Sequence, residues 1–238
     1  MYQISALKRF SSLVHAFSTK SDGNMSFRFG KKREVLKNRE KFLTKLNIDL
    51  SRCVVMHASH SEKVLFVDSS DGSVDADGSI TKKKNLYLLL LIADCLPIIL
   101  YDSKKEILGL VHAGWRNTNN RIVEKAVKKL SSEFGSKPPD LYVVIGPAIH
   151  KESYIFEDLV QKKSPEWKPY VEKIKGGGFT VDLIGYTKEQ LLSTGLNPKK
   201  IFESGVDTAK DQRFYSHYRD SRSHAGDSGR FVCVVGLR

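Results

Sequence analysis

The hydrophobic positions of the chain follow two patterns, one with the spacing of a helix and one made of short continuous runs. Apolar side chains recur at three- and four-residue intervals over residues 34–46 and again over residues 122–134, which predicts two amphipathic helices. The second helix is expected to end at Gly135 and to follow directly on a strand that ends at His112. Asp182 is placed to cap a third helix that runs to about Ser193.

The continuous apolar runs predict strands. Three of them, residues 86–92, 96–101 and 107–111, are typical of strands that are covered on both faces. Other β-type runs lie at residues 53–56, 64–67, 141–145 and 231–237. Because strands and helices alternate, we expect an α/β protein with at least one mixed sheet. No repeat or linker interrupts the pattern, so we expect a single domain over residues 1–238.

Composition narrows the class of protein. Hydrophobic residues make up 40% of the chain and charged residues 28%, as in ordinary globular proteins. Three cysteines do not form the disulfide framework of a small secreted domain, so we expect a reducing compartment and a cytoplasmic protein. We expect no membrane segment, because the longest apolar run contains Asp94 and is shorter than a bilayer span.

The net charge of +12 favours an anionic partner. We expect that partner to be a small anion such as phosphate rather than nucleic acid, because the basic clusters lack interleaved aromatic residues that would stack on bases. A basic nucleic-acid-binding module stays as the non-enzyme alternative, and it would show steeply salt-dependent affinity. The clusters are Lys31-Lys32-Arg33, Lys82-Lys83-Lys84, Lys128-Lys129, Lys162-Lys163 and Lys199-Lys200.

Three side chains from separate segments carry candidate chemistry. Cys95 lies between two apolar runs and just before a proline, His112 ends a predicted strand, and His60 follows a short strand, with His57 close by. Two imidazoles and one thiolate would give a tetrahedral metal site with one open position, as in catalytic zinc sites. Each residue also has a plain alternative role: a buried structural cysteine, a histidine that caps a strand, and a surface histidine.

The motifs around these residues resemble those of the YfiH family, whose members have been described as laccase-domain polyphenol oxidases and as purine nucleoside phosphorylases. The likeness extends in order from His15 to the C-terminus. The pair Ala-Asp-Cys-Leu-Pro and His-Ala-Gly-Trp-Arg is its most specific part. The matching segments are His15–Lys20, Ala93–Pro97, His112–Arg116, Ile145–Ile149, Phe214–Ser216, Arg219-Asp220 and Gly229-Arg230.

The resemblance implies an α/β fold with layered mixed sheets flanked by helices, and a zinc ion held by His60, Cys95 and His112. The family's spacing from its first ligand to a following valine fits His60, and not His57, ahead of Val64.

This chain also departs from the family pattern. Glu152-Ser153 and Asp207 stand where family members usually carry cysteines, which counts against a site for several coppers. Asn117 replaces a glycine and could narrow the site.

The activity that the resemblance implies is zinc-dependent phosphorolysis of adenosine, inosine and methylthioadenosine, with associated deamination of adenosine. Purine nucleoside and phosphate would be the partners. Candidate residues beyond the ligands are the arginines Arg116, Arg219 and Arg230 for phosphate, Trp115 or Tyr154 for stacking on the base, and Asp94 or Asp77 for orienting a ligand or moving a proton.

Two other enzyme hypotheses fit the same residues. Thiolate and imidazole also bind copper, so a copper-dependent polyphenol oxidase of the laccase type is one alternative. The other is a hydrolase without metal, in which Cys95 is the nucleophile and His112 the base.

Overall fold

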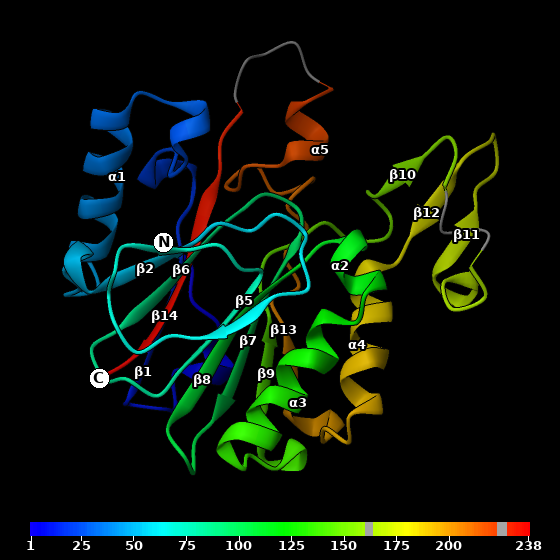
Figure 1. The fold of residues 1–238 in the computed structure, drawn as a ribbon. Helices are drawn as coiled ribbons and strands as arrows, with labels where there is room; N and C mark the ends of the chain where they lie inside the picture. Colours follow the sequence, from blue (N-terminus) through cyan, green and yellow to red (C-terminus); the bar gives the residue numbers. More distant parts are fainter. Residues whose placement is uncertain (160–163, 223–227) are drawn as a thin grey trace.

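Two large β-sheets lie face to face between layers of helix (Figure 1). The structure is a computed structural model that describes residues 1–159, 164–222 and 228–238, and the Lys162-Lys163 pair lies outside these residues. In Figure 1 the layers run from α1 at one side, through the two sheets, to α3 and α4 at the other.

The first sheet is mixed and has the strand order β1-β14-β6-β2-β4. β14 pairs antiparallel with both β1 and β6, whereas β2 runs parallel to β6 and β4. Its strands are β1 (Leu13–Phe17), β2 (Cys53–Met56), β4 (Ser73–Val74), β6 (Tyr87–Ile92) and β14 (Phe231–Leu237).

The second sheet is also mixed, with the order β13-β9-β7-β8-β5-β3. Its central strands β7 and β8 form an antiparallel hairpin over their full lengths. Its strands are β3 (Val64–Phe66), β5 (Gly78–Thr81), β7 (Leu96–Asp102), β8 (Ile107–Ala113), β9 (Tyr142–Ile145) and β13 (Ile201–Glu203).

The helices cover the two outer faces, and a small third sheet lies beside them (Figure 1). α1 packs on the first sheet through Phe42 and Leu43, and α3 and α4 pack on the second. The helices are α1 (Lys32–Thr44), α2 (Trp115–Asn119), α3 (Ile122–Phe134), α4 (Leu183–Ser193) and α5 (His217–Asp220). The third sheet consists of β10 (Ile155–Phe156), β11 (Val171–Lys173) and β12 (Phe179–Val181).

Alternation along the central strands explains the layers. Ile99 and Tyr101 of β7 face the space between the sheets, whereas Ile98 and Leu100 face α3 and α4. Both faces are therefore apolar, which is why these strands appear in the sequence as continuous runs. The α/β class with layered mixed sheets is confirmed.

The helix expected after His112 is two helices instead. Gly114 begins α2, and the chain then turns at Arg121, whose φ is +59°, before α3 starts. The apolar stripe predicted α3 and its stop at Gly135, which has φ +66°. The residues of α2 are mostly polar and form no apolar stripe, so the sequence did not indicate a break between two helices. Asp182 caps α4 as expected, because its carboxylate accepts a hydrogen bond from Gly185 N at 2.7 Å.

His15 of β1 is buried and is expected to make the fold sensitive to acid. Its Nε2 accepts a hydrogen bond from Ile4 N at 2.9 Å, and burial lowers the pKa of His15 from 6.5 to about 4. The unfolded chain therefore binds the proton more tightly, so the stability that a neutral His15 contributes is complete above pH 6.5 and is lost as the pH falls toward 4.

We expect His15→Gln to weaken this dependence, by on the order of 2 kcal/mol between pH 7 and pH 5. Urea unfolding of both proteins at the two pH values measures the difference. An equal loss of unfolding free energy in the variant would contradict this role for His15.

Within the described residues, no helix has the length and apolar character needed to cross a membrane.

Candidate metal centre

The three candidate ligands come together where the chain passes between the two large sheets. Cys95 lies in the short connection from β6 of the first sheet to β7 of the second, and His60 lies in the loop from β2 to β3. His112 is near the end of β8, opposite Pro97 of β7. The hairpin register thus brings Cys95 beside His112, although they are far apart in the sequence.

The geometry of this group suits one metal ion. One ligand atom each from His60, Cys95 and His112 lies within 4.8 Å of the other two, and the histidine rings have centroids 4.9 Å apart. His112 is buried and the other two residues are half-buried. Among the described residues, the buried Nδ1 of His60 has no hydrogen-bond partner. Such an atom is costly unless a ligand engages it.

Asp77 orients two of the three residues at once. Its Oδ1 accepts from His112 Nδ1 at 2.7 Å, which leaves Nε2 of His112 for the site. The same carboxylate accepts from the backbone N–H groups of Ser59, His60 and Ser61 at 3.1, 3.0 and 2.7 Å. His60 has a φ of +61°, a conformation that non-glycine residues adopt only when their surroundings impose it. Asp77 is therefore the residue that holds this loop in place.

Asn117 and Gly114 complete the frame around the site. The buried Asn117 amide donates to Asp77 Oδ1 at 3.2 Å and to the carbonyl of His112 at 2.8 Å, and it accepts from Gly114 N. A Cβ atom at Gly114 would lie 2.6 Å from His60 Nδ1 and 3.0 Å from Cys95 Sγ. A side chain at residue 114 would thus fill the space between the ligands, while Asn117 braces the site without entering it.

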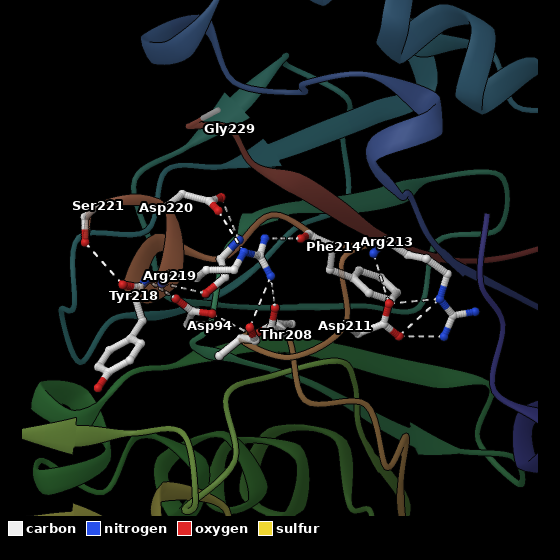
Figure 2. Close-up of polar contacts among 12 residues, drawn as sticks. Asp94, Thr208, Asp211, Arg213, Phe214, Tyr218, Arg219, Asp220, Ser221 and Gly229 are labelled. Carbon is white, nitrogen blue, oxygen red and sulfur yellow. Dashed lines mark hydrogen bonds and ion pairs between the residues drawn. The ribbon is translucent and has the colours of Figure 1, made fainter. Parts of the chain in front are cut away.

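Asp94 points away from this group. Figure 2 shows its carboxylate among the late segments of the chain, where it accepts from Thr208 Oγ1 and from Tyr218 N, both at 2.6 Å. Its φ is +80°, which aspartate tolerates better than most residues. Of the two aspartates proposed from the sequence, Asp77 contacts a candidate ligand, whereas Asp94 fastens the turn before Cys95 to α5.

The charges around the group act in opposite directions on its two histidines. Burial and the neighbouring His112 lower the pKa of His60, which favours the neutral ring that a metal needs. Although burial opposes its charged form, Cys95 and Asp77 raise the pKa of His112 to about 9 in the metal-free protein. A metal ion would therefore displace a proton from His112.

A cavity of about 640 Å³ opens on the candidate site, a size suited to a small-molecule ligand. Its wall is partly apolar and partly basic. Besides His60, Cys95 and His112, the residues that line it include Phe29, Met56, Ala58 and Leu91 on the apolar side, and Arg28, His57, His217 and Arg230 on the basic side.

The other residues singled out in the sequence occupy varied positions. Arg230 lines the cavity, and the exposed Arg116 lies over the ring of Trp115 at 4.6 Å, with that tryptophan packed against the α3–α4 core. The guanidinium of Arg219 is engaged by Asp220 and by the carbonyls of Thr208 and Phe214 (Figure 2).

Tyr154 packs edge-on against Phe156 and Tyr218. Neither it nor Arg219, Arg116 or Trp115 is among the residues that line the cavity. Sequence reasoning missed Arg28 and Phe29, because only the tertiary fold brings their loop to the cavity.

The donor set fits zinc. Two imidazole nitrogens and a thiolate are typical zinc ligands, and the ligand atoms of a tetrahedral zinc site lie roughly 3–4 Å apart. A tetrahedral ion held by these three residues would keep one position open for water or substrate. Among the described residues, this is the one group of three or more such side chains with metal-site spacing.

Two of the three positions where a family cysteine was expected, Ser153 and Asp207, lie in contact. Ser153 Oγ donates to Asp207 Oδ2 at 2.5 Å. The carboxylate also accepts from Ala209 N at 3.0 Å. The pair therefore acts as a hydrogen-bonded tie between two loops.

The family model and the relatives of known sequence that match this chain agree with one another. The family model described as multi-copper polyphenol oxidoreductase laccase matches residues 14–238. The purine nucleoside phosphorylase YlmD of Bacillus subtilis is 31% identical over 223 residues, which cover 87% of this chain and 79% of the relative. The protein of the same name from Geobacillus stearothermophilus is 30% identical over 96% of this chain and 92% of its own length.

Solved structures agree with these matches. The crystal structure of YlmD from Geobacillus stearothermophilus has a TM-score of 0.87 at 29% identity and covers 97% of this chain and 94% of its own. The hypothetical protein YfiH of Bacillus licheniformis has a TM-score of 0.86 at 28% identity, with 95% and 93% covered.

Proposed function

The chain belongs to the multi-copper polyphenol oxidoreductase laccase family, and on this premise we propose that it is a zinc-dependent purine nucleoside phosphorylase. The substrates are adenosine, inosine and methylthioadenosine, with hydrolytic deamination of adenosine as an associated activity. The observation that carries the proposal is the His60–Cys95–His112 group in the wall of a cavity of about 640 Å³. Relatives named purine nucleoside phosphorylase support the substrate class.

The reaction determines what the residues of the cavity must do. A phosphate oxygen attacks C1′ of the ribose, the bond from C1′ to N9 of the base breaks, and the base leaves with the electron pair and gains a proton. The second product is ribose 1-phosphate, or 5-methylthioribose 1-phosphate when methylthioadenosine is the substrate. The apolar wall at Met56 and Leu91 would exclude water from the base. Imidazoles transfer protons near neutral pH, and His57 and His217 both line the cavity.

The three ligands would hold zinc at one end of the cavity. When bound, zinc polarises substrate oxygens and activates water, which is the chemistry that replacement of the 6-amino group of adenosine by oxygen requires. Asp77 would keep His112 in the orientation that presents Nε2. Asn117 would hold Asp77 and His112 in place through its hydrogen bonds to both residues.

An assay for phosphate-dependent base release tests this function. We expect purified zinc-loaded protein to release adenine from adenosine and hypoxanthine from inosine when phosphate is present, with equal amounts of ribose 1-phosphate. Liquid chromatography of the reaction with and without phosphate measures both products. If folded protein with one zinc per chain released no base from any purine nucleoside, the proposed function would be abandoned.

Copper-dependent oxidation of phenols is the second candidate, because the matching family model carries that description. It requires electron transfer to oxygen, for which enzymes of this kind use several coppers. Within the described part of the chain one three-ligand group is present. Three positions that could have added sulfur ligands are Glu152, Ser153 and Asp207, the last two of which are hydrogen-bonded to each other. Oxygen uptake with phenols by the copper-loaded protein would favour this candidate over phosphorolysis.

A further inference from the structure

Two arginines that line the cavity contact the same aromatic ring. Arg28 and Arg230 both line the cavity that contains the candidate metal ligands. Their guanidinium carbons lie 5.5 and 4.5 Å from the centre of the same ring, that of Phe29. Across the described ranges, neither guanidinium is within ion-pair distance of a carboxylate, and the side-chain hydrogen bond of Arg230 goes to the carbonyl of Gly229 at 2.7 Å.

Three other arginines of the chain have guanidinium groups that are paired with carboxylates. Arg213 pairs with Asp211 at 2.6 Å, and Arg121 pairs with both Glu124 and Glu166. Arg219 binds a carboxylate and backbone carbonyls. Arg28 and Arg230 differ from these three because they line the cavity and have most of their donors available for a ligand.

Burial makes the charge of Arg230 unfavourable. Arg230 is half-buried, and burial lowers its pKa; Asp94, Cys95 and Asp220 raise it, whereas the positive charge of the exposed Arg28 lowers it. The half-buried Phe29 ring gives both guanidinium groups an aromatic contact. An anion that accepted hydrogen bonds from both forks would offset the repulsion and satisfy the donors.

We propose that Arg28, Phe29 and Arg230 form a subsite for a phosphate dianion in the same cavity as the His60–Cys95–His112 group. Tetrahedral phosphate oxygens match two guanidinium forks. The hydroxyl-bearing residues Ser26 and Ser228 line the cavity as well. The inference rests on the proposed function, in which this anion is the inorganic phosphate that attacks the ribose. A phosphate ester of a nucleotide has the same chemistry and is the other source.

Steady-state kinetics with single variants test the subsite. We expect Arg28→Gln and Arg230→Gln each to raise the KM for phosphate by about 10-fold or more, which is the loss of roughly one charge-assisted hydrogen bond. The KM for inosine should stay within about 2-fold. Arg230→Lys keeps the charge but loses the fork, so its KM for phosphate should lie between those of the wild type and Arg230→Gln.

Arg33→Gln is the matched control, because Arg33 is an exposed arginine of α1 outside the cavity. It should keep the wild-type KM for phosphate at constant ionic strength. Thermal unfolding of each variant establishes that it is folded at the assay temperature.

Calorimetric titration with inorganic phosphate and with adenosine monophosphate separates the subsite from the reaction. If phosphate binds in an arginine-dependent way but no base is released, the subsite stands and the proposed function fails. If adenosine monophosphate binds in an arginine-dependent way but phosphate alone does not bind, the subsite belongs to a nucleotide. Phosphorolysis with an unchanged KM for phosphate in both Gln variants would overturn the subsite and leave the proposed function standing. So would the absence of arginine-dependent binding for both anions.

Discussion

His60→Ala is expected to abolish stoichiometric zinc binding and to reduce phosphorolysis by more than about 100-fold, since even loss of a residue that only orients a ligand costs 10–100-fold in metal affinity. The variant removes one of three protein ligands and leaves Cys95 and His112 in place. Elemental analysis after dialysis gives the zinc content per chain, and the phosphate-dependent assay gives the rate.

This variant separates the metal hypothesis from the metal-free hydrolase. A Cys95–His112 dyad does not need His60, so retained activity in His60→Ala protein would contradict the metal hypothesis. His57→Ala is the matched control for zinc content, because His57 is an exposed histidine three residues away and lies outside the ligand group. Loss of zinc from His57→Ala instead would move the first ligand to His57.

Asp77→Asn is expected to lower zinc affinity by about 10–100-fold while the fold persists. Every partner of the carboxylate is a donor: His112 Nδ1, Asn117 Nδ2, and the N–H groups of the loop that carries His60. An asparagine NH₂ group would set a donor against some of these donors. The loss of buried hydrogen bonds should also cost about 1–3 kcal/mol of stability.

Competition with a chelator measures the affinity of Asp77→Asn, and urea unfolding measures its stability. Asp102→Asn is the matched control, because Asp102 is equally buried and accepts from the backbone of Lys104 and Lys105 in a turn. Asp102→Asn should lose stability and keep its zinc affinity. If both variants lost the same stability and neither lost affinity, Asp77 would have no role at the site beyond folding.

The layers of the fold could be predicted because their signals are local. The runs at β2, β6 and β14 have the expected bounds to within one residue, since fully buried strands need unbroken apolar sequence. β1 was missed because the buried His15 interrupts its run. β13 was missed because it is three residues long and half-buried.

The candidate site could be predicted only in part. Cys95 and His112 stand in specific motifs, and the spacing to Val64 chose His60 over His57. The structure places His60 in the group with Cys95 and His112. The contact between Asp77 and His112 could not be predicted from the sequence, because it depends on the pairing of β5 with β8.

The proposed phosphate contacts were the hardest part of the site to predict from the sequence. Arg219 stands in a family motif, yet its donors are used by nearby carbonyls, so we leave it out of the proposed phosphate contacts. Arg28 stands in no motif quoted from the sequence, yet it reaches the cavity beside Arg230. A charged side chain can bind a ligand only when the fold leaves its hydrogen-bonding groups available. Whether they are available depends on tertiary contacts.

Zinc titration of the metal-free protein is the most direct test of the central claim, that one metal ion held by His60, Cys95 and His112 supports phosphorolysis. The rate of phosphate-dependent hypoxanthine release from inosine is followed as zinc is added. We expect the rate to rise in proportion to bound zinc and to reach its plateau at one equivalent per chain. Full activity in the metal-free protein, or activity that appears only with several equivalents of copper, would contradict the claim.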